Sequence, residues 1–255
     1  MAISISAVII TFNEERNIER CIRSLRTIAD EIIVLDSFST DKTAEICKNL
    51  DVEFIQRAWE GYAASKNFLN QQAKFEYILS LDADEEISED LLKSLLVLKN
   101  SDFTGLGKVN RLTNYCGKWI HHSGWYPDWK IRLFPKDQCQ WVGDIVHEEL
   151  EVPKELVELE LNGDLFHYSY VNYEQHRKRA DHYSSLTAQK YVNQGKKVGV
   201  LSPYLSCLAR FFSMYVIKKG FLDGFAGFKI AQISGLSNQF KYKEVRRLNQ
   251  EKIRK

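Results

Sequence analysis

The chain has 255 residues, of which 44% are hydrophobic and 27% are charged, a composition typical of a globular protein with a sizeable core. Its five cysteines never stand as a CxxC pair, which argues against a structural zinc site and favours a reducing compartment. The apolar start runs directly into TFNEE without a basic region before it, so we predict no signal peptide and expect a cytoplasmic location. The net charge of +1 hides a split, since residues 171–255 carry 17 Lys/Arg against 5 Asp/Glu. We expect this basic end to contact something anionic, either phospholipid or nucleic acid.

Strands and helices alternate over the first eighty residues. Runs of β-branched and apolar residues predict strands, and stretches with helical spacing predict helices; in chain order these are 3–12 (strand), 13–25 (helix), 31–36 (strand), 39–50 (helix), 52–56 (strand), 61–73 (helix) and 77–81 (strand). Asn13 is a possible N-cap of the first helix, and Ser39 or Thr40 of the second. Short connections between alternating elements predict an α/β fold with a parallel, doubly wound sheet.

Acidic residues follow the fourth strand, in the sequence YILSLDADEEISED from Tyr77 to Asp90. Ligands of doubly wound sheets bind beyond the carboxyl ends of the strands. Clustered carboxylates repel one another unless a cation neutralises them, and magnesium and manganese prefer oxygen ligands together with substrate phosphates. The structural alternative is that the acids only favour the first turn of the next helix, which we expect to start at Ser88.

Other nucleotide- and metal-binding motifs are excluded. An EF-hand loop requires glycine at its sixth position, where this chain has Ile87. Neither a P-loop nor a strand-linked GxGxxG motif is present, so P-loop and classical dinucleotide sites are not predicted.

Several motifs occur together in the order found in one enzyme family. AVIITFNEERNIERCIRSL, IIVLDSFSTDKTAEI and YILSLDADEEI resemble the donor half of the inverting glycosyltransferases of family 2, and NRLTNYCGKWIHHSGWYPDWKIRLF and WVGDIVHEEL resemble the branch that adds glucose or a related sugar to the lipopolysaccharide inner core. The resemblance implies a catalytic domain of the GT-A type over residues 1–170, with a donor half over about 1–100 and an acceptor half over about 101–170. A helical basic extension follows over 171–255. It also implies transfer of a hexose, with glucose favoured, from a nucleotide diphosphate sugar (UDP-glucose favoured) to a lipid-linked oligosaccharide.

The resemblance implies a donor site at the strand ends, formed by Thr11, Phe12, Asn13, Asp36, Lys66, Asn67, Asp82, Ala83 and Arg132. In this interpretation Lys66 meets the donor phosphate or ribose, the alternative being a solvated helix lysine. Arg132 interrupts an apolar strand and therefore needs an anionic partner, for which a pyrophosphate is suitable. Ser37 departs from the family, in which a second acid often stands at this position, and this weakens the preference for UDP over other nucleotides.

The resemblance also implies a magnesium or manganese ion that bridges the donor phosphates and neutralises the charge on the leaving group. Asp84 is the main expected ligand, and Asp82 contacts the ribose or the metal. His167 follows an apolar stretch and is a possible third ligand, with a core histidine as the alternative.

The general base is expected to be a carboxylate in VGDIVHEEL. The matching family motif is the His-Glu pair, so we assign Glu148, with Asp144 and Glu149 as rivals and an ion pair with a nearby arginine as the structural alternative. His147 is expected to orient the base or to contact the acceptor.

Aromatic residues crowd the sequence GWYPDW. Trp125 and Tyr126 are expected to form a platform for the acceptor sugar, because aromatic faces stack on sugar rings; core packing is the alternative.

The basic end contains apolar residues at helical spacing, namely Leu201, Leu205, Leu208, Phe212 and Tyr215. This stretch is too interrupted to span a bilayer, which takes about 20 mostly apolar residues. It fits a helix lying on an anionic membrane surface, peripheral to the inner face of the plasma membrane, while packing on the catalytic domain or on a homodimer partner is the alternative. The basic residues between Lys241 and Lys255 would add attraction to anionic headgroups. No nucleic-acid-binding module accompanies the charge, so nucleic acid is not an expected partner.

Three other functions remain open from the sequence. A polyprenyl-phosphate sugar transferase would share the donor motifs. A sugar nucleotidyltransferase usually carries a glycine-rich, arginine-containing loop after the first strand, where this chain has TFNEER. A non-enzymatic, membrane-bound sugar-binding protein would not need Asp82, Asp84 and Glu148.

Overall fold

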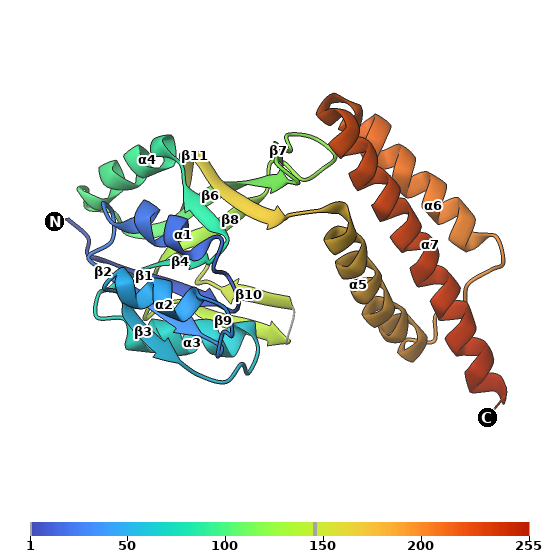
Figure 1. The fold of residues 1–255 in the computed structure, drawn as a ribbon, viewed down its shortest axis with the longest axis horizontal. Coiled ribbons are helices and arrows are strands. Elements are labelled where there is room, and N and C mark those ends of the chain that lie inside the picture. The colour runs from blue at the N-terminus through green and yellow to red at the C-terminus, as the bar shows by residue number, and fades with distance from the viewer. Residues whose placement is uncertain (1, 145–146, 255) are drawn as a thin grey trace. The chain divides into compact units, whose positions relative to one another are not determined.

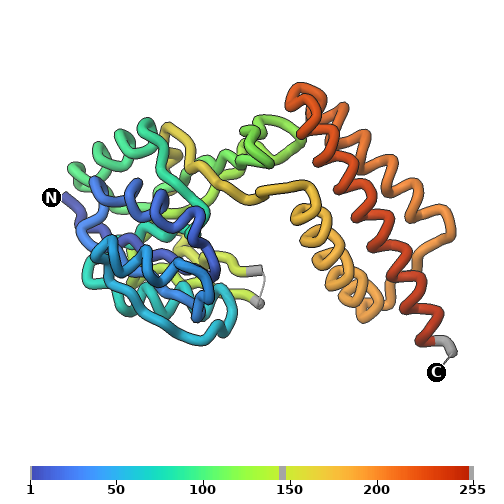
Figure 2. The backbone as a smooth tube through the Cα atoms, in the orientation of Figure 1, coloured from blue at the N-terminus to red at the C-terminus, as the bar shows by residue number. Residues whose placement is uncertain are grey.

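The computed structural model describes the backbone of residues 2–144 and 147–254, and the side chains of 2–143 and 148–252. It divides into two compact units, each built from two stretches of chain: unit 1 comprises Met1–Arg111 and Asp128–Tyr168, and unit 2 comprises Leu112–Pro127 and Ser169–Lys255. The backbone, traced in Figure 2, enters unit 2 at residue 112, returns to unit 1 at residue 128 and enters unit 2 again at residue 169.

The elements up to β4 alternate as the sequence predicts. In chain order they are β1 (Ile5–Thr11), α1 (Ile18–Leu25), β2 (Glu31–Asp36), α2 (Thr43–Asn49), β3 (Glu53–Gln56), α3 (Tyr62–Gln72), β4 (Tyr77–Asp82), β5 (Glu85–Ile87) and α4 (Glu89–Lys99). The second half adds β6 (Gly105–Tyr115), β7 (Lys118–Trp119), β8 (Trp129–Pro135), β9 (Gln140–Asp144), β10 (His147–Glu151), β11 (Val157–Tyr170), α5 (Tyr173–Asn193), α6 (Ser202–Phe212), the π-helical turn η1 (Ser213–Ile217), the 3-10 turn η2 (Gly220–Asp223) and α7 (Gly224–Arg254).

The main sheet has the strand order β3-β2-β1-β4-β8-β6-β11-β5, with β7 paired to β6. Figure 1 labels these strands on the ribbon, apart from β5. Strands β1 to β4 are parallel, as predicted, whereas β8 runs antiparallel to β4 and β6 antiparallel to β8. The α/β fold class is therefore confirmed, with antiparallel strands added by the second half. Strands β9 and β10 form a separate two-stranded sheet.

Strand alternation divides the core of unit 1 between the two faces of the sheet. Along β1, Ala7 and Ile9 face one way and pack with residues of α1 and α4, while Val8 faces the other way and packs with Leu69 of α3 and Trp141 of β9. Because side chains alternate along a strand, both faces of this central strand are apolar and buried.

The helix caps only partly follow the sequence-based expectations. Asn13 does not cap α1: its φ is 55°, and its side-chain oxygen accepts a hydrogen bond from the backbone N–H of Thr40 at 2.8 Å. Residue 42 takes the N-cap position of α2, and Ser39 instead donates its hydroxyl to Asp36. Helix α4 starts where expected, with Ser88 as its N-cap.

The Ser88 cap also joins helix α4 to strand β11. Its hydroxyl oxygen accepts from the backbone N–H groups of Leu91 at 3.3 Å and Asp164 at 3.1 Å. Gly163 precedes this contact with a φ of 97°, and a Cβ there would lie 2.1 Å from the Leu91 nitrogen. Only glycine permits so close a backbone approach at a positive φ.

Unit 2 has two apolar clusters. One joins Tyr115 and Ile120 of the first stretch to Met214 and Ile230 of the second. The other packs Ala188 and Val192 of α5 against Val245 of α7. None of the helices that the structure describes is long and apolar enough to cross a membrane.

Candidate functional site

The carboxyl ends of the parallel strands meet at one edge of the sheet. In the register of the sheet, Thr11 at the end of β1 lies beside Asp36 at the end of β2, and Ile10 lies beside Asp82 at the end of β4. Three of the predicted strand-end residues, Thr11, Asp36 and Asp82, are therefore brought together. This placement follows from parallel topology alone, which is why it is predictable from sequence.

Arg132 holds the end of β4 through two carboxylates. It projects from β8, is 4% exposed, and bonds Asp82 at 2.9 Å and Glu85 with a second, shorter contact. Glu85 also accepts from the backbone N–H of Asp82 at 3.0 Å. The anionic partners that Arg132 was expected to need are thus present within the protein, and a guanidinium so placed holds Asp82 in position.

Lys66 connects Asp82 with the expected general base. Its ammonium nitrogen lies 3.3 Å from Asp82 Oδ1 and 3.2 Å from Glu148 Oε1, and its side chain is 3% exposed. The nitrogen also lies 4.5 Å from the ring centre of Trp141, a cation–π geometry. The alternative of a solvated helix lysine is wrong, because Lys66 is a buried cation between two carboxylates.

The charges around Asp82 determine its protonation. Burial by itself raises the pKa of a carboxyl group, but the nearby charges of Lys66 and Arg132 outweigh this effect and hold the pKa of Asp82 well below its ordinary value. Asp82 is therefore a carboxylate with one oxygen paired to Lys66 and the other to Arg132.

Asp84 faces His167 of β11. Asp84 Oδ2 lies 3.4 Å from His167 Nε2, and both side chains are mostly buried. A carboxylate beside an imidazole nitrogen is a donor set that divalent metals accept. Among the described residues no group of three or more His, Cys, Asp and Glu is arranged to hold a metal. Magnesium commonly binds one or two carboxylates of a protein and takes its other ligands from substrate phosphates and water.

Asp36 is fully buried at the end of β2, and its oxygens are bonded within the protein. It accepts from the Ser39 N–H at 3.0 Å, from Gln56 Nε2 at 2.9 Å and from the Ser39 hydroxyl. Next to it, the buried Thr11 hydroxyl has no hydrogen-bond partner within the described part of the chain. Phe12 is exposed directly after the buried strand β1. Ala83 is buried between the two aspartates of the DAD sequence.

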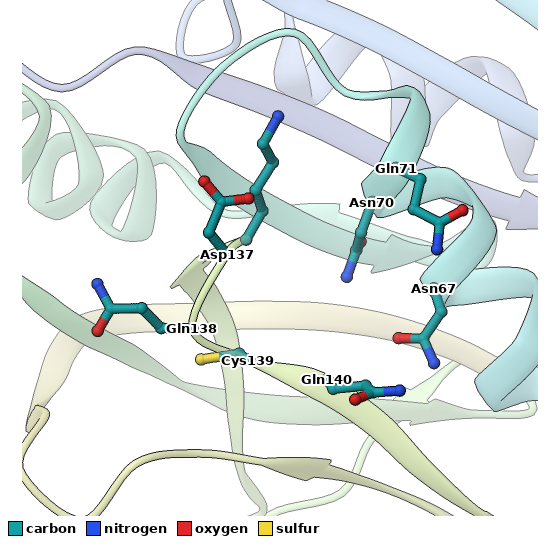
Figure 3. Close-up of a pocket in the computed structure, with 8 residues that line it drawn as sticks. Asn67, Asn70, Gln71, Asp137, Gln138, Cys139 and Gln140 are labelled. Carbon is teal, nitrogen blue, oxygen red and sulfur yellow. The ribbon is translucent and has the colours of Figure 1, made fainter.

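Asn67 bonds the backbone of β9. Its amide group donates to the backbone oxygen of Trp141 at 2.7 Å and accepts from the Trp141 N–H at 2.9 Å, which fastens α3 to β9. It also lines a pocket of about 530 Å³ (Figure 3), together with Asn70, Gln71, Lys136, Asp137, Gln138, Cys139 and Gln140. This pocket contains neither Asp82, Asp84 nor Glu148 and is not the site of the expected chemistry.

Of the expected acceptor residues, Trp125 and Tyr126 belong to unit 2 and His147 to unit 1. Trp125 belongs to unit 2, where its ring packs against Tyr115 at 5.4 Å, Tyr170 at 6.0 Å and His176 at 5.6 Å between centroids. Tyr126 packs edge-on against His121 at 5.4 Å. Trp125 thus makes the contacts that the core-packing alternative describes. The side chains of His147 and of the rival base Asp144 lie outside the described residues.

Sequence reasoning missed two charged residues that complete the cluster. Glu85 is 1% exposed and binds Arg132, and Arg111 of β6 lies 3.6 Å from Glu85 and 2.7 Å from Asp128. Arg111 was detectable by the same signal as Arg132, a basic residue within an apolar strand. Glu85 gives no such signal, because it stands in a run of acids that reads as the start of a helix.

Comparisons with known proteins find a matching family model and several relatives. The model of the family described as glycosyl transferase family 2 matches residues 6–147, more than half of the chain. An uncharacterized glycosyltransferase of Rickettsia typhi is 31% identical over 255 residues, which cover 96% of this chain and 87% of the relative. The lipopolysaccharide core biosynthesis glycosyltransferase LpsC of Rhizobium meliloti is 28% identical over 206 residues, covering 76% of this chain and 73% of LpsC. Among solved structures, S. aureus TarS aligns over 93% of this chain and 55% of its own, with a TM-score of 0.48 and 14% identity.

The family match confirms the predicted fold of the GT-A type and the prediction that the protein is a glycosyltransferase. It spans Asp36, Lys66, Asp82 and Asp84, so the charged cluster at the strand ends lies within the matched region. The chain belongs to glycosyl transferase family 2.

Proposed function

We propose that the protein is a metal-dependent, inverting hexosyltransferase that moves glucose from UDP-glucose to a lipid-linked core oligosaccharide. The observation that carries this proposal is the salt bridge of Lys66 to both Asp82 and Glu148. Lys66 contacts both Asp82 at the end of β4 and Glu148, although 82 residues separate Lys66 from Glu148 in the sequence. These contacts support Glu148 as the base that acts on a donor bound at this strand end. The name of LpsC, a lipopolysaccharide core biosynthesis glycosyltransferase, supports the choice of acceptor.

Asp84 and His167 are the residues that would hold the metal, since they present a carboxylate oxygen and an imidazole nitrogen 3.4 Å apart. When bound, a divalent ion supplies charge neutralisation for the departing diphosphate. Lys66 and Arg132 fix the Asp82 carboxylate beside this pair, so the local geometry is set before the substrate arrives. Preorganised charges of this kind cost no rearrangement during the reaction.

Glu148 is assigned as the general base. Its Oε1 is paired with Lys66, which orients the carboxylate, and Oε2 is the oxygen we assign to the acceptor proton. In the reaction, the acceptor O–H proton passes to Glu148 while the acceptor oxygen forms a bond to the anomeric carbon. The bond from that carbon to the donor phosphate oxygen breaks, and its electron pair leaves with the nucleoside diphosphate. A single displacement of this kind inverts the anomeric centre.

A donor screen tests the proposal. We expect UDP-glucose to raise the melting temperature of the purified protein only when manganese or magnesium is present, because a ligand that binds the native state stabilises it by mass action. Other nucleotide sugars serve as matched controls. Product analysis with a lipid-linked core acceptor should show one added hexose and stoichiometric release of UDP. Formation of UDP-glucose from UTP and glucose 1-phosphate would instead identify a nucleotidyltransferase.

A further inference from the structure

Unit 2 carries a concentrated set of exposed apolar side chains. Of the 22 large hydrophobic residues that the structure describes as exposed, 11 lie between residues 200 and 225. We call this surface the α6 face; its members are Val200, Leu201, Tyr204, Leu205, Leu208, Phe212, Val216, Ile217, Phe221, Leu222 and Phe225. Single exposed apolar residues are normal, but a cluster of this kind marks an interaction surface.

Helix α6 is apolar on two sides. Phe211 packs against Phe228 of α7, and Cys207 lies against Gly235 of the same helix. The exposed apolar residues Leu201 (the N-cap), Leu205, Leu208 and Phe212 follow one another at intervals of three or four residues, which places them on one side of the helix. A surface helix of a globular protein ordinarily presents polar residues on the side away from its core. The exposed apolar side of α6 therefore requires a cover.

The charge around the α6 face is one-sided. Residues 196–229 contain six basic residues, Lys196, Lys197, Arg210, Lys218, Lys219 and Lys229, and one acid, Asp223. Asp223 is buried and accepts hydrogen bonds from the backbone N–H groups of His121 and His122. Arg210, Lys218 and Lys219 are exposed among the apolar residues. Apolar side chains interspersed with cations complement a surface that has an acyl interior beneath anionic headgroups.

We propose that the α6 face docks the enzyme on an anionic phospholipid membrane, with helix α6 lying in the plane of the interface. Helix α6 and the adjoining turn η1 together cover residues 202–217, fewer than the about 20 residues that a membrane span requires, so the segment lies on the bilayer rather than crossing it. A second copy of the chain fits this face less well, because a symmetric contact would place the cations of one copy next to the same cations of the other, and these would repel one another. This proposal deepens the proposed function, since a lipid-linked acceptor is presented at such a surface.

The cations near the C-terminus have a different environment. Lys241 is half-buried, with its ammonium nitrogen 4.9 Å from the ring centre of Tyr242 and 2.8 Å from Asn238 Oδ1. Nearby, Val245 is fully buried against α5. Deleting the end of α7 would therefore damage the packing of unit 2, whereas point substitutions in the α6 face change only exposed side chains.

The test uses the full-length chain and sedimentation with vesicles of phosphatidylcholine alone or with 30% phosphatidylglycerol (roughly the charge density of an anionic leaflet). The apolar variant is Leu205→Gln with Leu208→Gln, whose side chains are 63% and 66% exposed. Its matched control is Val97→Gln with Leu186→Gln, which are exposed apolar residues outside the face, at 73% and 39%. A charge variant combines Arg210→Gln with Lys219→Gln.

We expect the unmodified protein to bind the anionic vesicles, more weakly as salt rises. The apolar variant should bind at least about tenfold more weakly, and the charge variant roughly tenfold more weakly. The control pair should bind like the unmodified protein, and melting curves of all forms should coincide. Vesicle binding that the apolar variant leaves unchanged would overturn the proposal. A dimer in sedimentation velocity that this variant converts to monomer, without vesicle binding, would also overturn it and assign the face to a second copy. Vesicle binding is measured without donor or acceptor. A failure of membrane docking is therefore distinguishable from a failure of the proposed glycosyl transfer.

Discussion

Lys66 on α3 and Glu148 on β10 form a salt bridge of 3.2 Å, and the same ammonium lies 3.3 Å from Asp82 on β4. Two carboxylates from distant parts of the chain thus share one buried cation. Removing one member of a buried ion pair commonly destabilises a protein more than replacing both members by apolar residues, because it leaves an uncompensated buried charge.

Lys66→Met should lower both stability and turnover. Without the cation, Asp82 and Glu148 repel each other, and we expect the free energy of unfolding to fall by about 3 kcal/mol. The double variant Lys66→Met with Glu148→Gln should recover part of this loss while staying inactive. Denaturant titration of the two single variants and the double variant measures the coupling. Strictly additive losses would show that the two side chains do not interact.

Glu148→Gln should lower turnover by roughly 10²- to 10⁴-fold, because glutamine keeps the shape of the side chain but cannot take the acceptor proton. Donor binding should change little, since the lost role belongs to the transition state. Glu149→Gln is the matched control: it is the next residue on β10 and points to the opposite face of the strand. If Asp144→Asn abolishes transfer and Glu148→Gln is mild, the base has been assigned to the wrong carboxylate.

Asp84→Asn should weaken metal-dependent donor binding sharply while the protein stays folded. An amide is a poorer ligand than a carboxylate for a hard cation. Calorimetric titration of UDP-glucose with and without manganese measures the effect. Glu86→Gln provides the control, because Glu86 is nearby in sequence but bonds the Tyr168 hydroxyl at 2.7 Å rather than His167. Equal donor affinities for the unmodified protein and Asp84→Asn in manganese would rule out the assignment.

The strand-end residues of this site were predictable from the sequence, whereas the salt bridges between residues distant in the chain were not. Strands β2 and β4 were predicted to within one residue, because β-branched runs between polar turns leave little ambiguity. Parallel topology then brings Asp36 and Asp82 to one edge. The partners of Lys66 depend instead on how α3 and β10 pack, which no local pattern encodes.

Local capping was harder to predict than topology. Asn13 has the composition of an N-cap, yet its side chain bonds Thr40 from the neighbouring β2–α2 connection. Asp41, rather than Ser39 or Thr40, accepts from the backbone N–H of Thr43 at the start of α2, at 2.9 Å. Polar residues in adjacent loops compete for the same backbone groups, and the sequence does not show which one succeeds.

His176 should make the stability of unit 2 depend on pH. Burial, with a smaller contribution from the charge of Arg179, lowers the pKa of His176 to about 4. Its Nδ1 lies 2.7 Å from the Tyr115 hydroxyl. The unfolded chain takes up a proton near pH 6.5, whereas the folded unit excludes it until about pH 4. The free energy of unfolding should therefore decrease as pH falls from 6.5 to 4, by on the order of 3 kcal/mol for this group.

Chemical unfolding at several pH values in this range, followed for the unmodified protein and for His176→Gln, measures that slope. The variant should be less stable at pH 7 but should lose less stability on acidification. His182→Gln replaces an exposed histidine on the same helix and should keep the original slope. An unchanged slope in His176→Gln would assign the acid sensitivity to other groups.

The two-stretch construction of unit 2 limits how this enzyme can be recombined with its relatives. Tyr115 and Ile120 fill a core whose other half comes from residues near 214 and 230, and Asp223 binds the backbone of His121 and His122. In a chimaera that exchanges only the C-terminal helices, the new helices would have to pack against residues 112–127 of a different protein, to which their side chains are not matched. Exchange should succeed only when residues 112–127 and the C-terminal helices are replaced together, which requires substitutions at two separate places in the gene.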